Sequence, residues 1–519
     1  MGNWMGIGRL AICGALVLAA CGGSGDDDGA ASTAATSSSV ATSSSVAQPA
    51  TTATSPGTGR PMTVDWIDDG QRQGTVEVPL DRSDPSAGTT DVTIRRRAAR
   101  NPDERIGVLF VNPGGPGLTG FQFIDNASNV FTSDITSRFD IVAVAPRGTF
   151  EPIEVECLNG DRFPDFITGA DWSPDEEGEA EALADHIGAI WESCVADGGG
   201  LLEHVSTMDT VHDMALVADA LGEDQVSYYG VSYGAPLGAT FATVYPELVR
   251  AAVLDAAFHP QFDVVESILA QARSFEARLA ALYEECDSNE NCPIEADARA
   301  AFERVAAVAD AGELQTNPDR PPINDEALIG SLFFHPDVYR GGSNRALLSA
   351  MAAADGGDAG PLQSRFVDLT QLQTGGPALI PIRCIDQPTR GESPPPADLA
   401  ELVAAEAPLL TALFPLWSER VNECDYWPVD PEPAPNPFSA ESAGPIMVLT
   451  SIDDVITPVG SAEQLSGELV DSALVYVESD IHGAYNSSPG PAHRCATGYV
   501  DVFLTTLERP ADGVTCAAD

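Results

Sequence analysis

A serine, a pair of aspartates and a histidine stand where they could together perform acyl transfer. Ser232 lies in the pattern Gly-Val-Ser-Tyr-Gly, directly after an apolar run and before a segment of small residues. Asp453 and Asp454 follow the run "PIMVLTS", and His482 follows the run "SALVYVES". A serine is a weak nucleophile until a base removes its proton, and an aspartate can orient that base. We therefore expect Ser232 as nucleophile, His482 as general base and one aspartate as its partner.

The order of these residues along the chain narrows the fold. Serine, then aspartate, then histidine is the order of the α/β-hydrolases, in which the nucleophile sits on a sharp turn between a strand and a helix. Each residue also follows an expected strand, where parallel sheets build their sites. The competing base is His493 in "GPAHRC", which has no strand before it and lies beside a predicted disulfide.

A glycine-rich loop could bind the negative charge that develops during such a reaction. The segment "FVNPGGPG" follows the apolar run that ends at Val111. Backbone N–H groups on a loop without bulky side chains can form an oxyanion hole. We expect the N–H of Gly115 and the N–H of Tyr233, the residue after the nucleophile, to serve as the pair.

The elements that must position these residues alternate between strand and helix. Continuous apolar runs predict buried strands, and apolar residues at helical spacing from Thr207 to Leu221 predict a helix behind a threonine cap. Such alternation predicts an α/β fold with a mostly parallel sheet flanked by helices. The runs with strand character are 75–80, 91–99, 106–111, 139–145, 225–230, 250–256, 445–451 and 472–479, and further helices are expected at 233–245 and 497–507.

The alternation of expected strands and helices is interrupted once. Together with the segments at the N-terminus, this interruption divides the chain into five predicted parts. After His259 come long Ala/Glu/Leu-rich helical stretches and Pro-rich loops, which indicate a helical cap inserted into the sheet domain. The predicted parts are a lipoprotein signal peptide at 1–21, a disordered Ser/Thr/Ala/Gly stalk at 22–60, hydrolase core at 61–259, the helical cap at 260–436 and the rest of the core, with aspartate and histidine, at 437–519.

The N-terminus predicts export. An apolar segment from Leu10 to Ala20 follows Arg9 and is too short to span a bilayer as a helix. It ends in Leu-Ala-Ala-Cys, which resembles a bacterial lipobox with Cys21 as the lipidated residue; a plain small-residue cleavage site is the alternative. The expected location is the cell envelope, with a lipid anchor on the outer face of a bacterial membrane.

Eight cysteines remain after the signal segment and Cys21. In an oxidising compartment an even set favours disulfides, although the connectivity is open. A zinc site is the rival, but there is no C-x-x-C pair and no histidine at ligand spacing, so we expect neither a metal nor another cofactor. Order and proximity suggest pairing Cys157 with Cys194, Cys286 with Cys292, Cys384 with Cys424, and Cys495 with Cys516.

The net charge excludes one class of partner. The 519-residue chain carries 78 acidic and 26 basic residues, a formal charge of -52. Such a surface repels nucleic acid and anionic lipid headgroups. We therefore expect no nucleic-acid partner, and contact with a membrane only through the anchor.

Several segments together resemble a known family. They are "NPGGPG", "PRG", "YYGVSYGAPLGATFATVYPELVRAAVLDAAFHP", "RCIDQ", "CDYWP" and "HGAY", and they resemble the secreted tripeptidyl aminopeptidase group of α/β-hydrolases (peptidase family S33) over nearly the whole chain after the stalk. The family's aspartate stands four residues before a proline, which selects Asp454 over Asp453. Two positions depart from the family pattern: Ala145 replaces the aspartate of "DPRG", and Val455 replaces the proline after the catalytic aspartate.

The resemblance implies a function and a further residue. It implies a serine exopeptidase that releases short peptides from free N-termini through an acyl-enzyme, with Asp386 in "RCIDQ" as a candidate for binding the substrate amine. A carboxylesterase would use the same triad and differ only in the cap. The non-enzyme alternative is a binding lipoprotein on an inactive hydrolase fold, against which the intact Ser232, Asp454 and His482 argue.

Overall fold

The computed structural model describes most of the chain after residue 61. The predicted signal peptide, Cys21, the predicted stalk and Cys157 lie outside the described residues. The described residues are 62–68, 70–151, 153–155, 158, 162–174, 177–260, 264–295, 297–335, 344–373, 378–387, 398–419 and 423–518.

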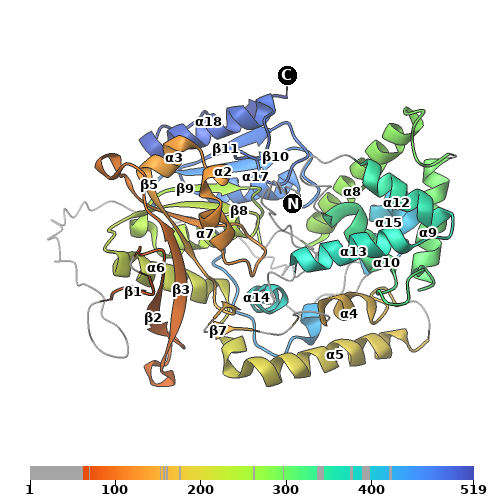
Figure 1. Cartoon of the computed structure of the whole chain (residues 1–519), viewed down its shortest axis with the longest axis horizontal. Helices are drawn as coiled ribbons and strands as arrows, with labels where there is room; N and C mark the ends of the chain where they lie inside the picture. The colour runs from red at the N-terminus through yellow and green to blue at the C-terminus, as the bar shows by residue number, and fades with distance from the viewer. Residues whose placement is uncertain are drawn as a thin grey trace, which may run out of the picture.

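A ten-stranded sheet occupies the left part of the molecule in the view of Figure 1. Its strands are β1 (Asp65–Trp66), β2 (Gln73–Pro79), β3 (Thr89–Arg97), β4 (Gly107–Asn112), β5 (Phe139–Val144), β8 (Val226–Val231), β9 (Val249–Asp255), β10 (Ile446–Ser451), β11 (Ser472–Val477) and β12 (Val514–Cys516), while β6 (Thr149–Phe150) and β7 (Ile153–Glu154) pair separately. The order across the sheet is β1-β2-β3-β5-β4-β8-β9-β10-β11-β12. Pairing is antiparallel as far as the β3–β5 pair and parallel from β5 to β12, so the mostly parallel sheet predicted from the sequence is confirmed.

Helices cover both faces of this sheet. The helices outside residues 260–436 are α1 (Phe121–Asp125), α2 (Ala127–Val130), α3 (Ser133–Arg138), α4 (Arg162–Thr168), α5 (Glu179–Gly198), α6 (Thr207–Leu221), α7 (Gly234–Val244), α17 (Val459–Glu468) and α18 (Pro491–Thr506). Helices α1, α3 and α18 share one apolar layer with the sheet, and α6, α7 and α17 share the other. Within the described part of the chain, no helix is long and apolar enough to cross a membrane.

Helix α6 shows how local signals fix the ends of an element. Its N-cap is Ser206, not the predicted Thr207: the Ser206 hydroxyl accepts a hydrogen bond from the Asp209 N–H, and the Asp209 carboxylate accepts one from the Ser206 N–H. This reciprocal capping satisfies two backbone donors at the start of the helix. Gly222, with φ of 76°, ends the helix in the left-handed conformation that glycine adopts readily.

The insertion forms a helical lobe beside the sheet (Figure 1). Its described helices are α8 (Val264–Asp287), α9 (Ala298–Asp310), α10 (Asp325–Ile329), α12 (Arg345–Asp355), α13 (Gly360–Gln373), α14 (Leu379–Asp386), α15 (Leu399–Glu406) and α16 (Pro408–Leu413). The segment carrying α4 and α5, which the sequence placed in the first part of the core, packs against this lobe. The Ser173 hydroxyl donates to Asp325 at 3.2 Å, and the Trp191 ring meets the Trp427 ring edge-on. The cap is therefore built from two separate stretches of sequence.

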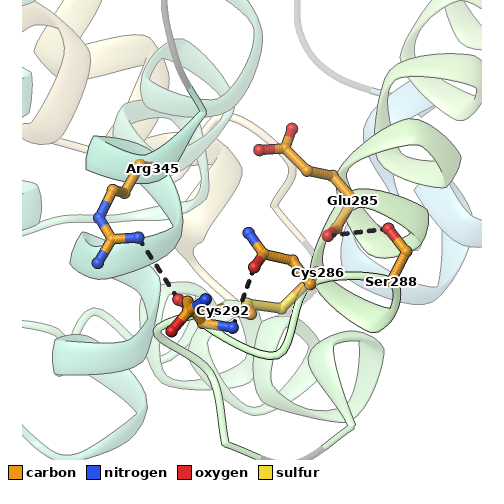
Figure 2. The surroundings of a disulfide bond; sticks show 7 residues. Glu285, Cys286, Ser288, Cys292 and Arg345 are labelled. Atoms are coloured by element: carbon orange, nitrogen blue, oxygen red, sulfur yellow. Dashed lines mark hydrogen bonds between the residues drawn. A yellow bond between two sulfur atoms is a disulfide. The ribbon is translucent and has the colours of Figure 1, made fainter.

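Disulfides fasten the cap and the C-terminus. Cys286 is joined to Cys292, Cys384 to Cys424, and Cys495 to Cys516. The first bond closes the turn after α8 (Figure 2). In this turn the Cys292 N–H also donates to the Asn289 carbonyl. Cys194 is disulfide-bonded as well, while its expected partner lies outside the described residues.

Candidate active site

The turn between β8 and α7 presents Ser232 in a strained conformation. Its φ is 58°, a value that a residue with a side chain rarely adopts. The flanking glycines are required by close backbone approaches. A Cβ on Gly230 would lie 2.2 Å from the Gly234 carbonyl oxygen, and one on Gly234 would lie 2.5 Å from the Asn112 carbonyl oxygen. The glycines at both ends of the pattern thus allow the tight turn that carries the serine.

Asp454 and His482 form a buried pair. The Nδ1 of His482 lies 2.8 Å from Oδ2 of Asp454, and both residues are at most 2 % exposed. The Asp454 carboxylate also accepts hydrogen bonds from the backbone of Ile456 at 2.8 Å and from the hydroxyl of Thr457 at 2.9 Å. With Nδ1–H directed at the aspartate, the lone pair of the ring lies on Nε2, which is the form a general base needs.

Asp453 and His493, which the sequence offered as alternatives to Asp454 and His482, have other partners. Asp453 is exposed, and its backbone N–H donates to the Ser479 carbonyl. His493 is buried between other partners: its Nε2 lies 2.9 Å from the Ser479 hydroxyl, and its Nδ1 lies 2.9 Å from both the Ser487 hydroxyl and the Ala484 carbonyl. His493 therefore supports the loop that carries His482.

The glycine-rich loop lies directly on the nucleophile turn. A Cβ on Gly114 would lie 2.9 Å from the Ser232 Cβ and 3.0 Å from the Tyr233 backbone nitrogen. The Gly114 N–H is committed to the Asn112 side chain at 2.8 Å. In the part of the chain that the structure describes, neither the Gly115 N–H nor the Tyr233 N–H donates to another protein group. Both amides are thus available for an oxyanion.

Asp386 lies at the boundary between cap and core. Its carboxylate accepts the backbone N–H of Thr207 at 2.8 Å and the Thr207 hydroxyl at 2.5 Å. The Thr207 hydroxyl is also hydrogen-bonded to the hydroxyl of Tyr233, the residue after the nucleophile. Burial raises the pKa of Asp386 to about 7, although the two hydrogen bonds from Thr207 act in the opposite direction. The sequence did not indicate that this carboxylate meets the start of α6.

Sequence reasoning missed a second buried carboxylate beside the nucleophile. Asp255 ends β9 and is fully buried, and its backbone carbonyl accepts the Ser232 N–H at 2.9 Å. Its position at the carboxyl end of the run "RAAVLDA" was a usable signal, because such strand ends are where sites form. Thr457, which donates to Asp454, had no comparable signal in the sequence.

The arrangement supports nucleophilic catalysis by a serine. A strained serine turn, a buried histidine–aspartate pair and two available amides are the parts that acyl transfer requires. Two family models match the chain: "alpha/beta hydrolase fold" over residues 108–318, which include Ser232, and "TAP-like protein" over 412–516, which include Asp454 and His482. The protein is therefore an α/β-hydrolase.

Similarity to curated proteins indicates which kind of α/β-hydrolase this chain is. Serine protease Hip1 of Mycobacterium tuberculosis is 25% identical over 464 residues, covering 85% of this chain and 86% of the relative. Tripeptidyl aminopeptidase of Streptomyces lividans is 27% identical over 467 residues (86% and 83%), and carboxylesterase B of M. tuberculosis is 26% identical over 470 residues (86% of each). Within the α/β-hydrolases this chain is a TAP-like serine hydrolase.

Proposed function

We propose that this protein is an exported serine exopeptidase that releases short peptides from free N-termini. The observation that carries the proposal is the buried pair of Asp454 and His482, 2.8 Å apart, in a fold that also presents Ser232 on a strained turn. The peptidase names of two of the three relatives, at similar identity and coverage, favour an amide substrate over an ester.

In the first half of the reaction, the Ser232 hydroxyl attacks the carbonyl carbon of the scissile peptide bond while His482 takes its proton. The Gly115 and Tyr233 N–H groups stabilise the oxyanion of the tetrahedral intermediate. Asp454 holds the imidazole in its orientation and stabilises the imidazolium. The C–N bond then breaks, and His482 gives the proton to the leaving amine, so that the short N-terminal peptide remains as an ester on Ser232.

In the second half, water takes the place of the leaving amine. His482 removes a proton from the water as its oxygen attacks the ester carbonyl, and the same amides stabilise the new oxyanion. Collapse of this intermediate breaks the ester bond and returns the proton from His482 to Ser232. The products are the free short peptide and the starting enzyme, and no metal or organic cofactor takes part.

We propose Asp386 as the group that distinguishes a free substrate amine. Its carboxylate accepts the hydroxyl of Thr207, which is in turn hydrogen-bonded to the side-chain hydroxyl of Tyr233, the residue after the nucleophile. An ammonium group would stabilise the charged form of this carboxylate, whose pKa burial raises to about 7. The cap position of α14 would then set how many residues fit between the amine and Ser232.

A carboxylesterase is the second candidate function. The relative named carboxylesterase B matches this chain at 26% identity, close to the values for the two peptidases. Ester hydrolysis needs the same serine, histidine, aspartate and oxyanion amides, so the core does not separate the two reactions. Only the groups of the cap that meet the substrate can do so.

The proposed location follows from the sequence before the described residues. A lipid on Cys21 and the 22–60 stalk would hold the enzyme on the outer face of a bacterial membrane, with the anchor as the sole membrane contact. The strongly acidic surface disfavours binding to nucleic acid. Retention of the labelled mature protein in a detergent phase, lost in Cys21→Ala, would test this location.

Three substrates test the proposed activity. We would compare release from a free-amino tripeptide anilide, its N-acetylated twin and a short p-nitrophenyl ester, with Ser232→Ala as the control. The proposal predicts cleavage of the free-amino anilide well above its acetylated twin. Cleavage of the ester alone would contradict the exopeptidase and leave the carboxylesterase.

A further inference from the structure

We propose that Asp255 is a positioning residue that fixes Ser232 and His482 relative to each other by holding the backbone of both segments. The proposal rests on the roles proposed for Ser232 and His482, and it adds a residue that the Ser-Asp-His mechanism does not use. It concerns how Ser232 and His482, which are separated by 250 residues of sequence, keep their positions relative to each other.

The position of Asp255 in the sheet places it between the strands that lead to Ser232 and Asp454. It is the last residue of β9, which lies between β8 and β10. Strand β8 leads into the Ser232 turn, and β10 leads to Asp454. Asp255 pairs with Val231 on one side and with Leu449 on the other, so it occupies the middle of the strand ends that carry the site.

Its hydrogen bonds reach both catalytic segments. On the nucleophile side, the Asp255 carbonyl accepts the Ser232 N–H at 2.9 Å. On the histidine side, Oδ1 accepts the Ala484 N–H at 2.8 Å and Oδ2 accepts the Tyr485 N–H at 2.9 Å. Ala484 and Tyr485 directly follow Gly483 in the loop that begins at His482, so movement of this loop would break two charge-assisted hydrogen bonds.

The chemistry of the site requires a carboxylate. The two oxygens accept three donors, because the Tyr229 hydroxyl also donates to Oδ2 at 3.0 Å. An asparagine would offer one acceptor oxygen and would turn an NH2 group toward a backbone N–H. Leaving a buried donor without an acceptor is costly, so the loop would shift away from its position.

The surroundings of Asp255 act on its charge in two directions. Burial, the largest effect, raises the pKa of Asp255, whereas its hydrogen bonds and the charge of a protonated His482 lower it. The N–H groups of Ala484 and Tyr485 and the hydroxyl of Tyr229 therefore favour the carboxylate form of Asp255.

Asp255→Asn tests the proposal, with Asp501→Asn as the matched control. Asp501 accepts the hydroxyl of Tyr485 at 2.9 Å from α18, so it contacts the same loop residue without binding the Ser232 segment. In Asp255→Asn we expect kcat to fall about 10²-fold, the effect of a misplacement on the order of 1 Å, with KM within about threefold. The Asp501→Asn control should stay within about twofold of wild type.

Each outcome of this experiment decides the proposal. A folded Asp255→Asn protein with kcat within about twofold of wild type would overturn it, because a merely structural role predicts only a lower Tm. If Asp255→Asn does not fold, Tyr229→Phe decides: it removes one donor to the carboxylate, and we expect kcat to fall about threefold or more, whereas an unchanged kcat would overturn the proposal. Failure of wild type to react with a fluorophosphonate at Ser232 would instead contradict the proposed function.

Discussion

The core and the cap hold their important carboxylates in different ways. In the core, Asp255 ends β9 and Asp454 follows β10, and both accept hydrogen bonds from backbone amides of loops at this edge of the sheet. At the cap boundary, Asp386 ends a helix and accepts hydrogen bonds from one residue at the start of α6. From this difference we propose that the core carries out the chemistry and that the boundary selects the substrate. Core substitutions should therefore slow every substrate, and boundary substitutions should change the ranking of substrates.

The largest expected effect belongs to the aspartate of the core pair. Asp454→Asn should lower kcat about 10⁴-fold on peptide and ester alike, because the amide no longer selects the imidazole form that can accept the serine proton. The neighbouring Asp453→Asn is the matched control and should change kcat by less than about threefold, since Asp453 is exposed, whereas Asp454 carries the hydrogen bond to Nδ1 of His482. Steady-state kinetics on both substrates would check this, and equal losses in the two variants would contradict the assignment.

A smaller loss is expected from the turn that carries the serine. Gly234→Ala would place a Cβ 2.5 Å from the Asn112 carbonyl oxygen, a backbone atom that cannot move without shifting the oxyanion loop. We expect kcat to fall about 10²-fold on all substrates, together with a lower Tm. Gly460→Ala, in α17, is the control because its Cβ would meet no atom within 4 Å. Unchanged kcat in Gly234→Ala would show that the turn tolerates a side chain.

Substitution of Asp386, at the boundary between cap and core, should affect different substrates unequally. Asp386→Asn should lower kcat/KM about tenfold for the free-amino tripeptide anilide and leave its N-acetylated twin within about twofold, because only the free amine uses the charge. In wild type the preference for the free amine should rise with pH through about 7, where Asp386 ionises, and this rise should disappear in the variant. Exposed Glu401→Gln in α15 is the control. Equal losses on both anilides would show that Asp386 serves only the start of α6.

The smallest effect concerns stability and also follows from Asp386. Its folded pKa of about 7 lies above the ordinary value of 3.8, so between these values the native state keeps a proton that the unfolded state has lost. The contribution of Asp386 to the free energy of unfolding should therefore fall as pH rises through this window and level off above about 7. The measurement is the urea midpoint of wild type minus the urea midpoint of Asp386→Asn. This difference should be lower at about pH 7.5 than at about pH 4.5. An increase would contradict the raised pKa.

The sequence pattern was sufficient to predict an element where residues close together in the sequence determine its ends or its burial. Helix α6 ends where it was predicted, because a capping serine and a left-handed glycine bound an apolar stripe of helical spacing. The buried strands β4, β5 and β8 follow from continuous apolar runs. By contrast, β12 has three residues, too few for a pattern to be visible.

Contacts between distant segments were not predictable in this way. Helix α5 has buried residues at helical spacing, among them Leu183, Ile187 and Trp191, so its existence was readable although it was not predicted. Its packing against the cap depends on Trp427, more than two hundred residues away, which no local period encodes. Likewise, Asp453 and Asp454 both follow β10, and it is burial that distinguishes them in the structure. Asp386 was singled out by resemblance, while its contact with Thr207 needed the fold.

The most direct test of the account is covalent labelling of the nucleophile. The folded wild-type protein should react with a fluorophosphonate at a single site that peptide mapping places on Ser232. Labelling should be absent in Ser232→Ala and at least about 10³-fold slower in His482→Ala, which lacks the base. No reaction in folded wild type, or an adduct on another residue, would contradict a serine hydrolase centred on Ser232 and would favour a binding protein on an inactive hydrolase fold.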